Sequence, residues 1–440
     1  MQKVKAILSF VLLVVIGSSA NAQVLTLNEA VKTALKNSYD IQLVENSLAI
    51  AKNNNDLGVA GALPTITATA NNNKSISTIQ QNFADPSRNT TKSGVDGNTV
   101  TAGLTASVVI FNGYRIMTTK DRLASIEKQN GFLLKAQMNN TVALVMQQYY
   151  NVARQQAYLK TIQKSIDASQ QRLDIVKTRQ QVGVANQADI LQSNLDLNAL
   201  VQAKRNQELL IAQSKSDLLR TMVMPEGSVN AIQVQDSIQV DAKLKYTGAD
   251  GIENSIAQNP QMAAIAQQVD INKLIEKETK ALLYPTLRAS TGYNINSTTS
   301  AAGFALLNET YGPFLGVNLA IPIYAGGLAK KNLKNARTNS SSAALQYNNA
   351  MQDTKNNAYK TNEAYQNSIQ QIPVETENYN MSQSLLDLVM QKYQLGQATM
   401  IEVKQAQQSF ENAGFRLVSL RYTAKIAEIE LKRLANQLNF

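Results

Sequence analysis

The apolar residues of segment 123–176 recur with the period of a helix. Eight of them are three, four or seven positions apart: Val145, Tyr149, Val152, Leu159, Ile162, Ile166, Leu173 and Val176. This spacing forms one narrow stripe on an α-helix, as in coiled-coil packing. Helical patterns also cover 26–60, 186–224, 250–281, 326–394 and 399–437. Pro373 lies within one of them, where its missing N–H and its ring predict a kink or an interruption.

Four short segments alternate with the period of a strand instead. Apolar residues alternate with small or polar ones in 63–72, 98–111, 286–296 and 312–323. Each predicted strand has about ten residues, which is the length that a tilted strand needs to cross a bilayer. A soluble β-sandwich would show the same alternation, so this pattern alone allows both structures.

Three observations favour the membrane. In each predicted strand, every second residue is apolar and the residues between them are small or polar. This is expected where the apolar residues face lipid on the outside and the polar ones face water on the inside. Aromatic residues mark the strand ends, where interfacial girdles form: Phe111, Tyr114, Tyr284, Tyr311, Phe314 and Tyr324. Polar loops at 73–97 and 297–310 join the strands, and we expect them outside the cell. Four strands cannot close a barrel, and open edges in lipid leave backbone groups unpaired, so closure requires several copies of the chain.

The two halves of the chain repeat the same signatures. Gly113 in the sequence FNG recurs as Gly326 in YAG, and Gly183 in QVG recurs as Gly396 in QLG, both at an offset of 213. In each half, 70 residues separate the two glycines, enough for a helix of roughly 105 Å. A period this long indicates one structural unit made twice rather than a solenoid. We predict a first repeat over 23–224, a linker over 225–248 and a second repeat over 249–440.

The composition excludes most classes of enzyme. The chain has no His, no Cys and no Trp, which removes His/Cys metal sites, Ser-His and Cys-His nucleophile systems, and disulfides. We therefore expect no catalytic residue, no cofactor and no bound metal. The net charge is +10, but the Lys and Arg residues are dispersed and no basic run is interleaved with aromatics. We expect no nucleic-acid partner.

The first 22 residues have the order of a secretory signal. Lys3 and Lys5 precede an apolar run over 6–16, and an A-x-A site ends at Ala22. We expect cleavage before Gln23 and export of the mature chain. No later segment approaches 18 consecutive apolar residues, so the sequence predicts no helical membrane anchor.

Six motifs, in this order, resemble those of the TolC-like outer-membrane efflux proteins over essentially the whole mature chain. Two are helix-to-strand turns, LPT at 63–65 and YPT at 284–286. Two are strand-to-helix junctions, FNG at 111–113 and PIYAGG at 322–327. Two are helix-hairpin tips, at 179–191 and 393–403. Each motif alone is weak, but their duplicated order after a signal segment is specific.

The resemblance implies a fold that is mainly α with a membrane β-barrel portion. A homotrimer would combine four strands from each protomer into one twelve-stranded barrel in the outer membrane of a Gram-negative cell. A long α-helical periplasmic barrel would continue it, with an equatorial belt near the linker, where Ile232 and Val234 begin a period-two pattern that predicts a short strand. The implied function is a passive exit duct for small toxic compounds or proteins in a tripartite efflux or type I secretion system. Its implied partners are outer-membrane lipid, a periplasmic adaptor (membrane fusion) protein and an inner-membrane pump.

The resemblance also assigns roles to the hairpin tips. In the family these turns contact the adaptor, and the matching residues here are Val182, Gly183, Val184, Leu395, Gly396 and Gln397. Gln397 stands at a position that is usually apolar in the family. The gate and the entrance ring carry over to Asp189, Tyr393 and Glu402. Ala398 stands where the family usually has the gate arginine, and Gln405 stands where it has the second acidic residue of the entrance ring. We therefore expect weaker contacts in the closed gate and a less negative entrance.

An alternative from a different class stays open at this point. The chain could form a periplasmic coiled-coil scaffold without a pore, with its strands in a soluble sandwich. Dependence on detergent would separate the scaffold from the duct. The tip residues also have simpler explanations, because glycine suits any tight turn and Asp189 suits any helix N-terminus.

Overall fold

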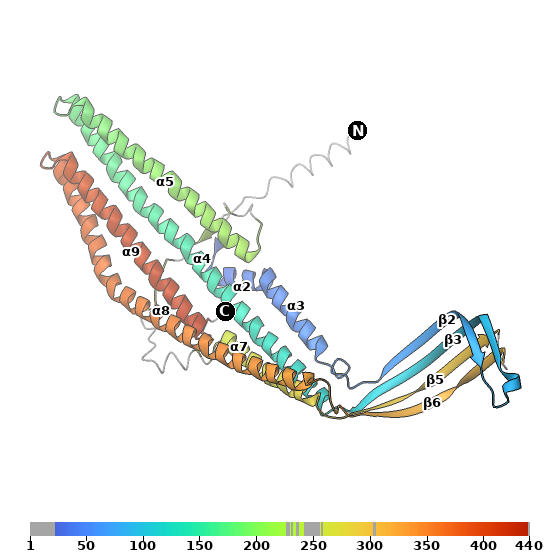
Figure 1. Cartoon of the computed structure of the whole chain (residues 1–440). Coiled ribbons are helices and arrows are strands. Elements are labelled where there is room, and N and C mark those ends of the chain that lie inside the picture. The colour runs from blue at the N-terminus through green and yellow to red at the C-terminus, as the bar shows by residue number, and fades with distance from the viewer. Residues whose placement is uncertain are drawn as a thin grey trace, which may run out of the picture. The chain divides into compact units, whose positions relative to one another are not determined.

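The computed structural model of this chain describes residues 23–225, 229, 232–234, 237–241, 256, 258–301 and 305–438 (Figure 1). The predicted signal segment and parts of the predicted linker lie outside these residues. The helices are α2 (Leu27–Asn37), α3 (Tyr39–Asn54), α4 (Arg115–Gln181), α5 (Gln187–Met222), α7 (Pro260–Ala281), α8 (Leu328–Gln394) and α9 (Met400–Leu434), with the short turn η1 (Pro86–Arg88). The strands are β1 (Gln23–Leu25), β2 (Thr65–Gln81), β3 (Thr90–Phe111), β4 (Ile232–Val234), β5 (Thr286–Ser300) and β6 (Leu307–Ala320).

The chain divides into two compact units, and each takes segments from both predicted repeats. The hairpin unit comprises Met1–Asn46, Phe132–Ala263 and Asn349–Phe440. The sheet unit comprises Ser47–Gly131 and Ala264–Asn348. Each is described by itself below. Every helix of the described segments is too short or too polar to span a membrane.

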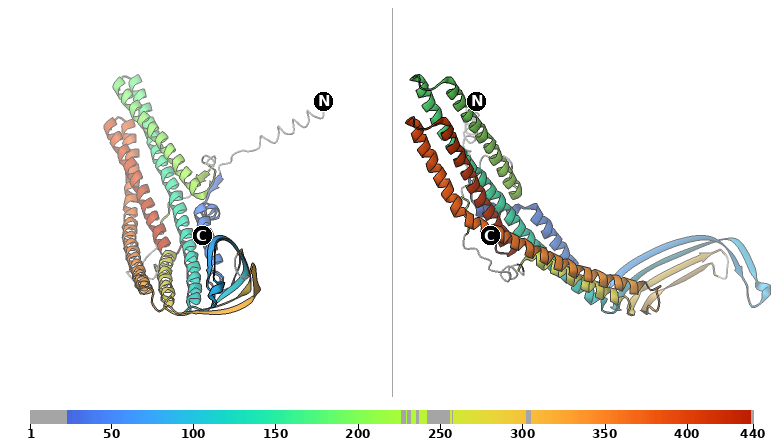
Figure 2. Two further views of the ribbon diagram at one scale, coloured as in Figure 1. Left: turned by 45° about the vertical axis from the view of Figure 1, so that its right-hand side comes forward. Right: turned by 60° about the vertical axis from the view of Figure 1, so that its left-hand side comes forward.

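The hairpin unit consists mainly of two helical hairpins, α4 with α5 and α8 with α9 (Figures 1 and 2). Its largest hydrophobic cluster joins α4, α5 and α9 to α2, and Tyr149, Leu218 and Ile429 are fully buried in it. The apolar stripe predicted on α4 therefore supplies the core, as its spacing requires. β1 and β4 close this cluster as a parallel pair, which confirms a short strand at Ile232 within the predicted linker.

One helix prediction needs correction and another is narrowed. The predicted helix 26–60 is broken at Ser38, whose extended backbone (φ −56°, ψ 121°) ends α2. Polar residues such as Asn37 and Ser38 compete with the helical hydrogen bonds and favour such a break. At Pro373 α8 continues without the interruption that was one of the two predicted outcomes, and the kink stays a prediction. This proline is on the exposed side of the helix, where a carbonyl that loses its helical partner can bind water instead.

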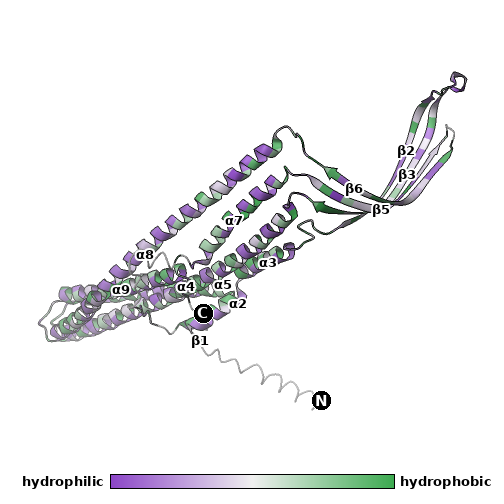
Figure 3. Cartoon of the chain, turned by 90° about the horizontal axis from the view of Figure 1, so that it is seen from below, coloured by the Kyte–Doolittle hydropathy of each residue, from purple (hydrophilic) through white to green (hydrophobic). Residues whose placement is uncertain are grey.

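The sheet unit contains four antiparallel strands in the order β2-β3-β5-β6. Residues directly opposite on neighbouring strands lie on the same face of a sheet. One face carries the rows Ile66, Ala106, Thr291 and Leu315, then Ala68, Leu104, Tyr293 and Pro313. The other face carries rows such as Thr67, Thr105, Gly292 and Phe314. The predicted division into an apolar and a small, polar face is confirmed, and Figure 3 shows the resulting mixture of hydrophobic and hydrophilic residues along the strands.

The strands are longer than the predicted ten residues. They have 17, 22, 15 and 14 residues in chain order. Most of the predicted loop 73–97 is strand, because Asn73 to Gln81 pairs with the start of β3. Backbone hydrogen bonds hold this part of the hairpin, and they need no apolar side chains. Period-two patterning therefore underestimated the length.

Phe314 does not lie in a girdle at a strand end, as we predicted, but in the middle of β6 on the polar face. Its ring covers Gly292, directly opposite on β5. A Cβ atom at Gly292 would be 2.1 Å from the carbonyl oxygen of Leu104 and 2.8 Å from the Phe314 ring. Any other residue at 292 would force the strands apart, so this glycine allows the close approach.

Candidate functional site

The first hairpin tip joins α4 to α5 through Gly183. Its φ of 77° lies in the left-handed region, which glycine adopts without strain. Asn186 then caps α5: its side chain accepts a hydrogen bond from the Asp189 N–H at 2.9 Å, and the Asp189 carboxylate accepts one from the Asn186 N–H at 3.2 Å. This reciprocal capping box stabilises the start of α5. The predicted turn at Gly183 is confirmed.

The second tip repeats this geometry between α8 and α9. Gly396 also has φ of 77°. Thr399 caps α9 by accepting from the Glu402 N–H at 3.3 Å, and the Glu402 carboxylate accepts from the Thr399 N–H at 2.6 Å. The hydrogen bonds from the Thr399 backbone and hydroxyl lower the pKa of Glu402. Asp189 and Glu402 thus share one local role, as caps of two helices.

The outermost side chains of both tips are apolar and exposed. Val182, Val184 and Leu395 are 71%, 75% and 73% exposed, and Gln397 is exposed beside them. Next to the turns a second hydrophobic cluster packs α4 against α8 and α9, with Val176, Tyr393 and Phe410 at its centre. The turns therefore lie next to a packed hydrophobic cluster, and their outermost apolar side chains are exposed.

Tyr393 is the best buried of the predicted gate residues, at 4% exposure. The Arg179 guanidinium of α4 donates a hydrogen bond to the Tyr393 carbonyl and stacks 4.5 Å from the centre of its ring. Burial raises the pKa of the Tyr393 hydroxyl, the charges of Arg179 and Arg172 oppose this rise, and the nearby Asp189 carboxylate adds to it. Asp189 and Tyr393 thus interact electrostatically, but no hydrogen bond joins them within the described residues.

An ionic cluster that sequence reasoning missed joins three helices near the tips. Arg172 of α4 is fully buried and donates to the Asp196 carboxylate of α5 at 2.8 Å. The other oxygen of Asp196 accepts from Lys404 of α9 at 3.0 Å. The Nε and Nη1 atoms of Arg172 are buried without a hydrogen-bond partner among the described residues. Asp196 is therefore the principal counter-charge of a buried guanidinium.

A sequence signal for this cluster exists in hindsight. Ser165, Ser169, Arg172 and Val176 are spaced by four, three and four residues, and all four are buried on one stripe of α4. A charge within a stripe of small and apolar residues requires a buried partner. The partner itself is not readable from the sequence, because Asp196 lies on another helix.

No group of His, Cys, Asp or Glu side chains in the described parts of the chain could hold a metal ion. The tip chemistry consists of turns, caps, ion pairs and apolar ends.

Comparison with known families identifies the class of protein. The profile described as "Outer membrane efflux protein" matches residues 30–222 and 251–437. The chain belongs to this family, as the six motifs indicated.

Solved structures show the same fold. The chain is similar to the CusC channel structure (17% identity, 93% of this chain and 91% of that chain covered, TM-score 0.74). It is also similar to the CmeC outer membrane channel of Campylobacter jejuni (16% identity, 94% of this chain and 87% of that chain covered, TM-score 0.76). A third similar structure is the outer membrane protein VceC of Vibrio cholerae (16% identity, 93% of this chain and 95% of that chain covered, TM-score 0.75). No curated protein matches the sequence.

The predicted fold class is therefore confirmed: the protein is a TolC-like channel, mainly helical with a membrane β-barrel portion. Its function is that of an outer-membrane exit duct for efflux. Between the two functions that the sequence allowed, the family decides for the duct and against the coiled-coil scaffold.

Proposed function

We propose that three copies of this chain form the passive exit duct of a tripartite efflux or type I secretion system, in which an inner-membrane pump supplies the energy. The observation that carries this proposal is the sheet with two unpaired edges, β2 with 17 residues and β6 with 14. One face of this sheet is apolar, and backbone groups at an edge in lipid must be paired. Pairing of β6 with β2 of the next copy satisfies both edges and closes a twelve-stranded barrel.

The hairpin tips are the proposed docking site of a periplasmic adaptor. Val182, Val184 and Leu395 present apolar ends that no described residue covers. Beside them, α4 and α8 border a groove of about 760 Å³ with three carboxylates, Asp167, Asp174 and Asp387, and one cation, Lys164. Together these features favour an adaptor segment with an apolar end and basic flanks. Gly183, Gly396 and Gln397 complete the contact at the turns.

The gate of the duct would lie among the contacts that hold the two hairpins together. Asp189, Tyr393 and Glu402 remain the positions that the family resemblance predicts. The cluster of Arg172, Asp196 and Lys404 adds an ionic connection between α5 and α9. In this proposal the duct opens when these helices separate, and Glu402 lines the entrance with its charge. The mature chain is exported by its signal segment, and its hairpins lie in the periplasm. We propose no catalytic step.

Planar-bilayer conductance of the detergent-purified protein, with the oligomer mass measured on the same sample, tests this function. Trimeric channels with a cation preference that decreases in Glu402→Gln are the expected result. A monomeric or dimeric species without conductance would overturn the trimeric duct. Trimeric channels with unchanged selectivity would remove Glu402 from the entrance but leave the duct intact.

A further inference from the structure

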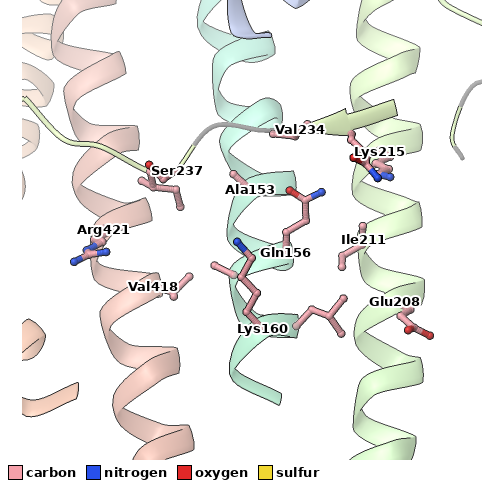
Figure 4. A pocket seen from close by; sticks show the side chains of 14 residues that line it. Ala153, Gln156, Lys160, Glu208, Ile211, Lys215, Val234, Ser237, Val418 and Arg421 are labelled. Carbon is pink, nitrogen blue, oxygen red and sulfur yellow. The ribbon is translucent and has the colours of Figure 1, made fainter. Parts of the chain in front are cut away.

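A cavity of about 570 Å³ lies in the hairpin unit, at a different place from the tips. α4, α5 and α9 line it, and Gln233, Val234, Ser237 and Ile238 border one side. Figure 4 shows this arrangement, with Val234 of this covering segment beside α5 and Ser237 beside α9. The volume is within the range of about 300–1,000 Å³ that is typical of small-molecule sites.

The charges around the cavity do not balance. Lys160, Lys215 and Arg421 line it together with only one carboxylate, Glu208. None of the ion pairs in the described segments involves these four residues. Within the part of the chain that the structure describes, Arg421 donates to the Thr376 hydroxyl, at 3.4 Å. Figure 4 shows the Lys160 and Gln156 side chains on α4 at one side of the cavity and Lys215 on α5 beside Val234.

Lys215 is the most unusual of these cations. It is half-buried, and burial lowers its pKa without an opposing contribution from an acidic neighbour. A desolvated ammonium group without a counter-charge is unfavourable, and a bound anion would relieve that cost. The cavity therefore offers an anion two lysine side chains and the Gln156 amide.

The rest of the lining is apolar. Ala157 and Leu159 of α4, Ile211 of α5, Val418 of α9 and Val234 of the covering segment supply hydrocarbon surface. Small side chains on α4 leave the space open, and the larger aliphatic ones form its walls. This surface would accept an alkyl chain, since apolar burial contributes about 25 cal/mol per Å².

We propose that this cavity binds a single-chain amphiphile with a carboxylate head group, such as a long-chain fatty acid. The carboxylate lies between Lys160 and Lys215, and the alkyl chain lies against Ile211 and Val418. The charge complementarity selects the anion, and the apolar walls select the chain. This site is independent of the tips and of the gate.

Binding of dansyl-labelled undecanoic acid to the full-length protein in phosphatidylcholine nanodiscs tests the proposal, with empty nanodiscs as the blank. Saturable binding that dodecanoate displaces, and that dodecanol and acetate do not, is the expected result. Lys160→Gln combined with Lys215→Gln should weaken binding at least about tenfold, because a charged hydrogen bond contributes about 1.5–3 kcal/mol. Displacement by dodecanol as strong as that by dodecanoate would overturn the carboxylate site.

Three further variants separate binding from folding. Lys32→Gln with Lys36→Gln removes two exposed charges from α2 in the same unit and should leave binding unchanged. Lys215→Arg keeps the charge and should retain binding. Ala157→Phe fills the cavity while both lysines stay, and it should abolish binding with an unchanged oligomer mass. Wild-type affinity in the double lysine variant or in Ala157→Phe would contradict the proposal.

Discussion

The two hairpin tips are copies of one backbone design with different side-chain chemistry. Gly183 and Gly396 have the same φ of 77°, and the caps Asn186 and Thr399 stand at the same offset of 213 as the glycines. The residues that connect the tips do not repeat. The positions equivalent to Arg172 and Asp196 in the second repeat are Leu385 and Ser409.

This comparison shows what duplication preserves. Turns and caps depend on a few neighbouring residues, so both repeats keep them. Contacts between the repeats need complementary side chains, and two identical surfaces rarely provide them. The Arg179 guanidinium of the first hairpin stacks on the Tyr393 ring of the second. Lys392, which is equivalent to Arg179 in the second repeat, is exposed. The side chains that differ between the repeats therefore form the charged and aromatic contacts between the hairpins, where a gate would need them.

The largest expected effect is at Asp196. Asp196→Ala leaves the buried Arg172 without its main counter-charge and should destabilise the hairpin unit by about 3–5 kcal/mol. Urea denaturation followed by limited proteolysis near the tips would measure it, and we also expect more frequent channel opening. Ser409→Ala is the matched control in the second repeat and should have little effect. Equal effects of the two variants would disprove the asymmetry.

The next largest effect concerns the two turns. Gly183→Ala and Gly396→Ala each force a side chain into the left-handed region, at a cost of roughly 1–2 kcal/mol. A Cβ would meet nothing within 4 Å at Gly183 and only Arg179, at an ordinary 3.7 Å, at Gly396. The losses of stability in urea should therefore be equal within error. A clearly larger loss at one tip would show that the two backbones are not equivalent.

The contact between Arg179 and Tyr393 should be weaker. A double-mutant cycle with Arg179→Ala and Tyr393→Leu should give a coupling energy of about 0.5–2 kcal/mol, as expected for a partly buried cation above a buried aromatic ring. Lys392→Ala combined with Tyr393→Leu is the control and should show no coupling. A coupling of zero in the first cycle would show that the ring contact adds nothing to the hydrogen bond from Arg179 to the Tyr393 carbonyl, which Tyr393→Leu keeps.

The smallest effect is a pH dependence of the second cap. Because the pKa of Glu402 is lowered in the folded chain, its cap is fully present above the unfolded glutamate value of about 4.3 and is lost as the pH falls through the folded value. Amide-exchange protection at Glu402 should therefore decrease in acid. Glu402→Gln keeps a capping side chain and should remove this dependence. Glu29, whose pKa the Thr26 hydrogen bonds lower in the same way, should respond like Glu402.

Local patterns predicted much of the fold, but not its exact limits. The helical stripe on α4, the alternating strands and the turns at Gly183 and Gly396 were predicted from neighbouring residues and are present. The break at Ser38 and the position of Phe314 were not predicted, and of the two outcomes predicted at Pro373 the interruption is absent. At Pro373 solvent exposure, and at Phe314 the close approach of Gly292, outweigh a local preference, whereas at Ser38 the polar residues themselves favour the break.

The sequence by itself determined the family, the duplicated helices and strands, and the two glycine turns, because periodicity, capping and backbone preference act over a few residues. Only the tertiary structure decided which charges are buried and which helices they join. Asp196 accepts from Arg172, 24 residues away on α4, and from Lys404, 208 residues away on α9. Such contacts depend on the packing of whole helices, and no spacing along the chain encodes that packing.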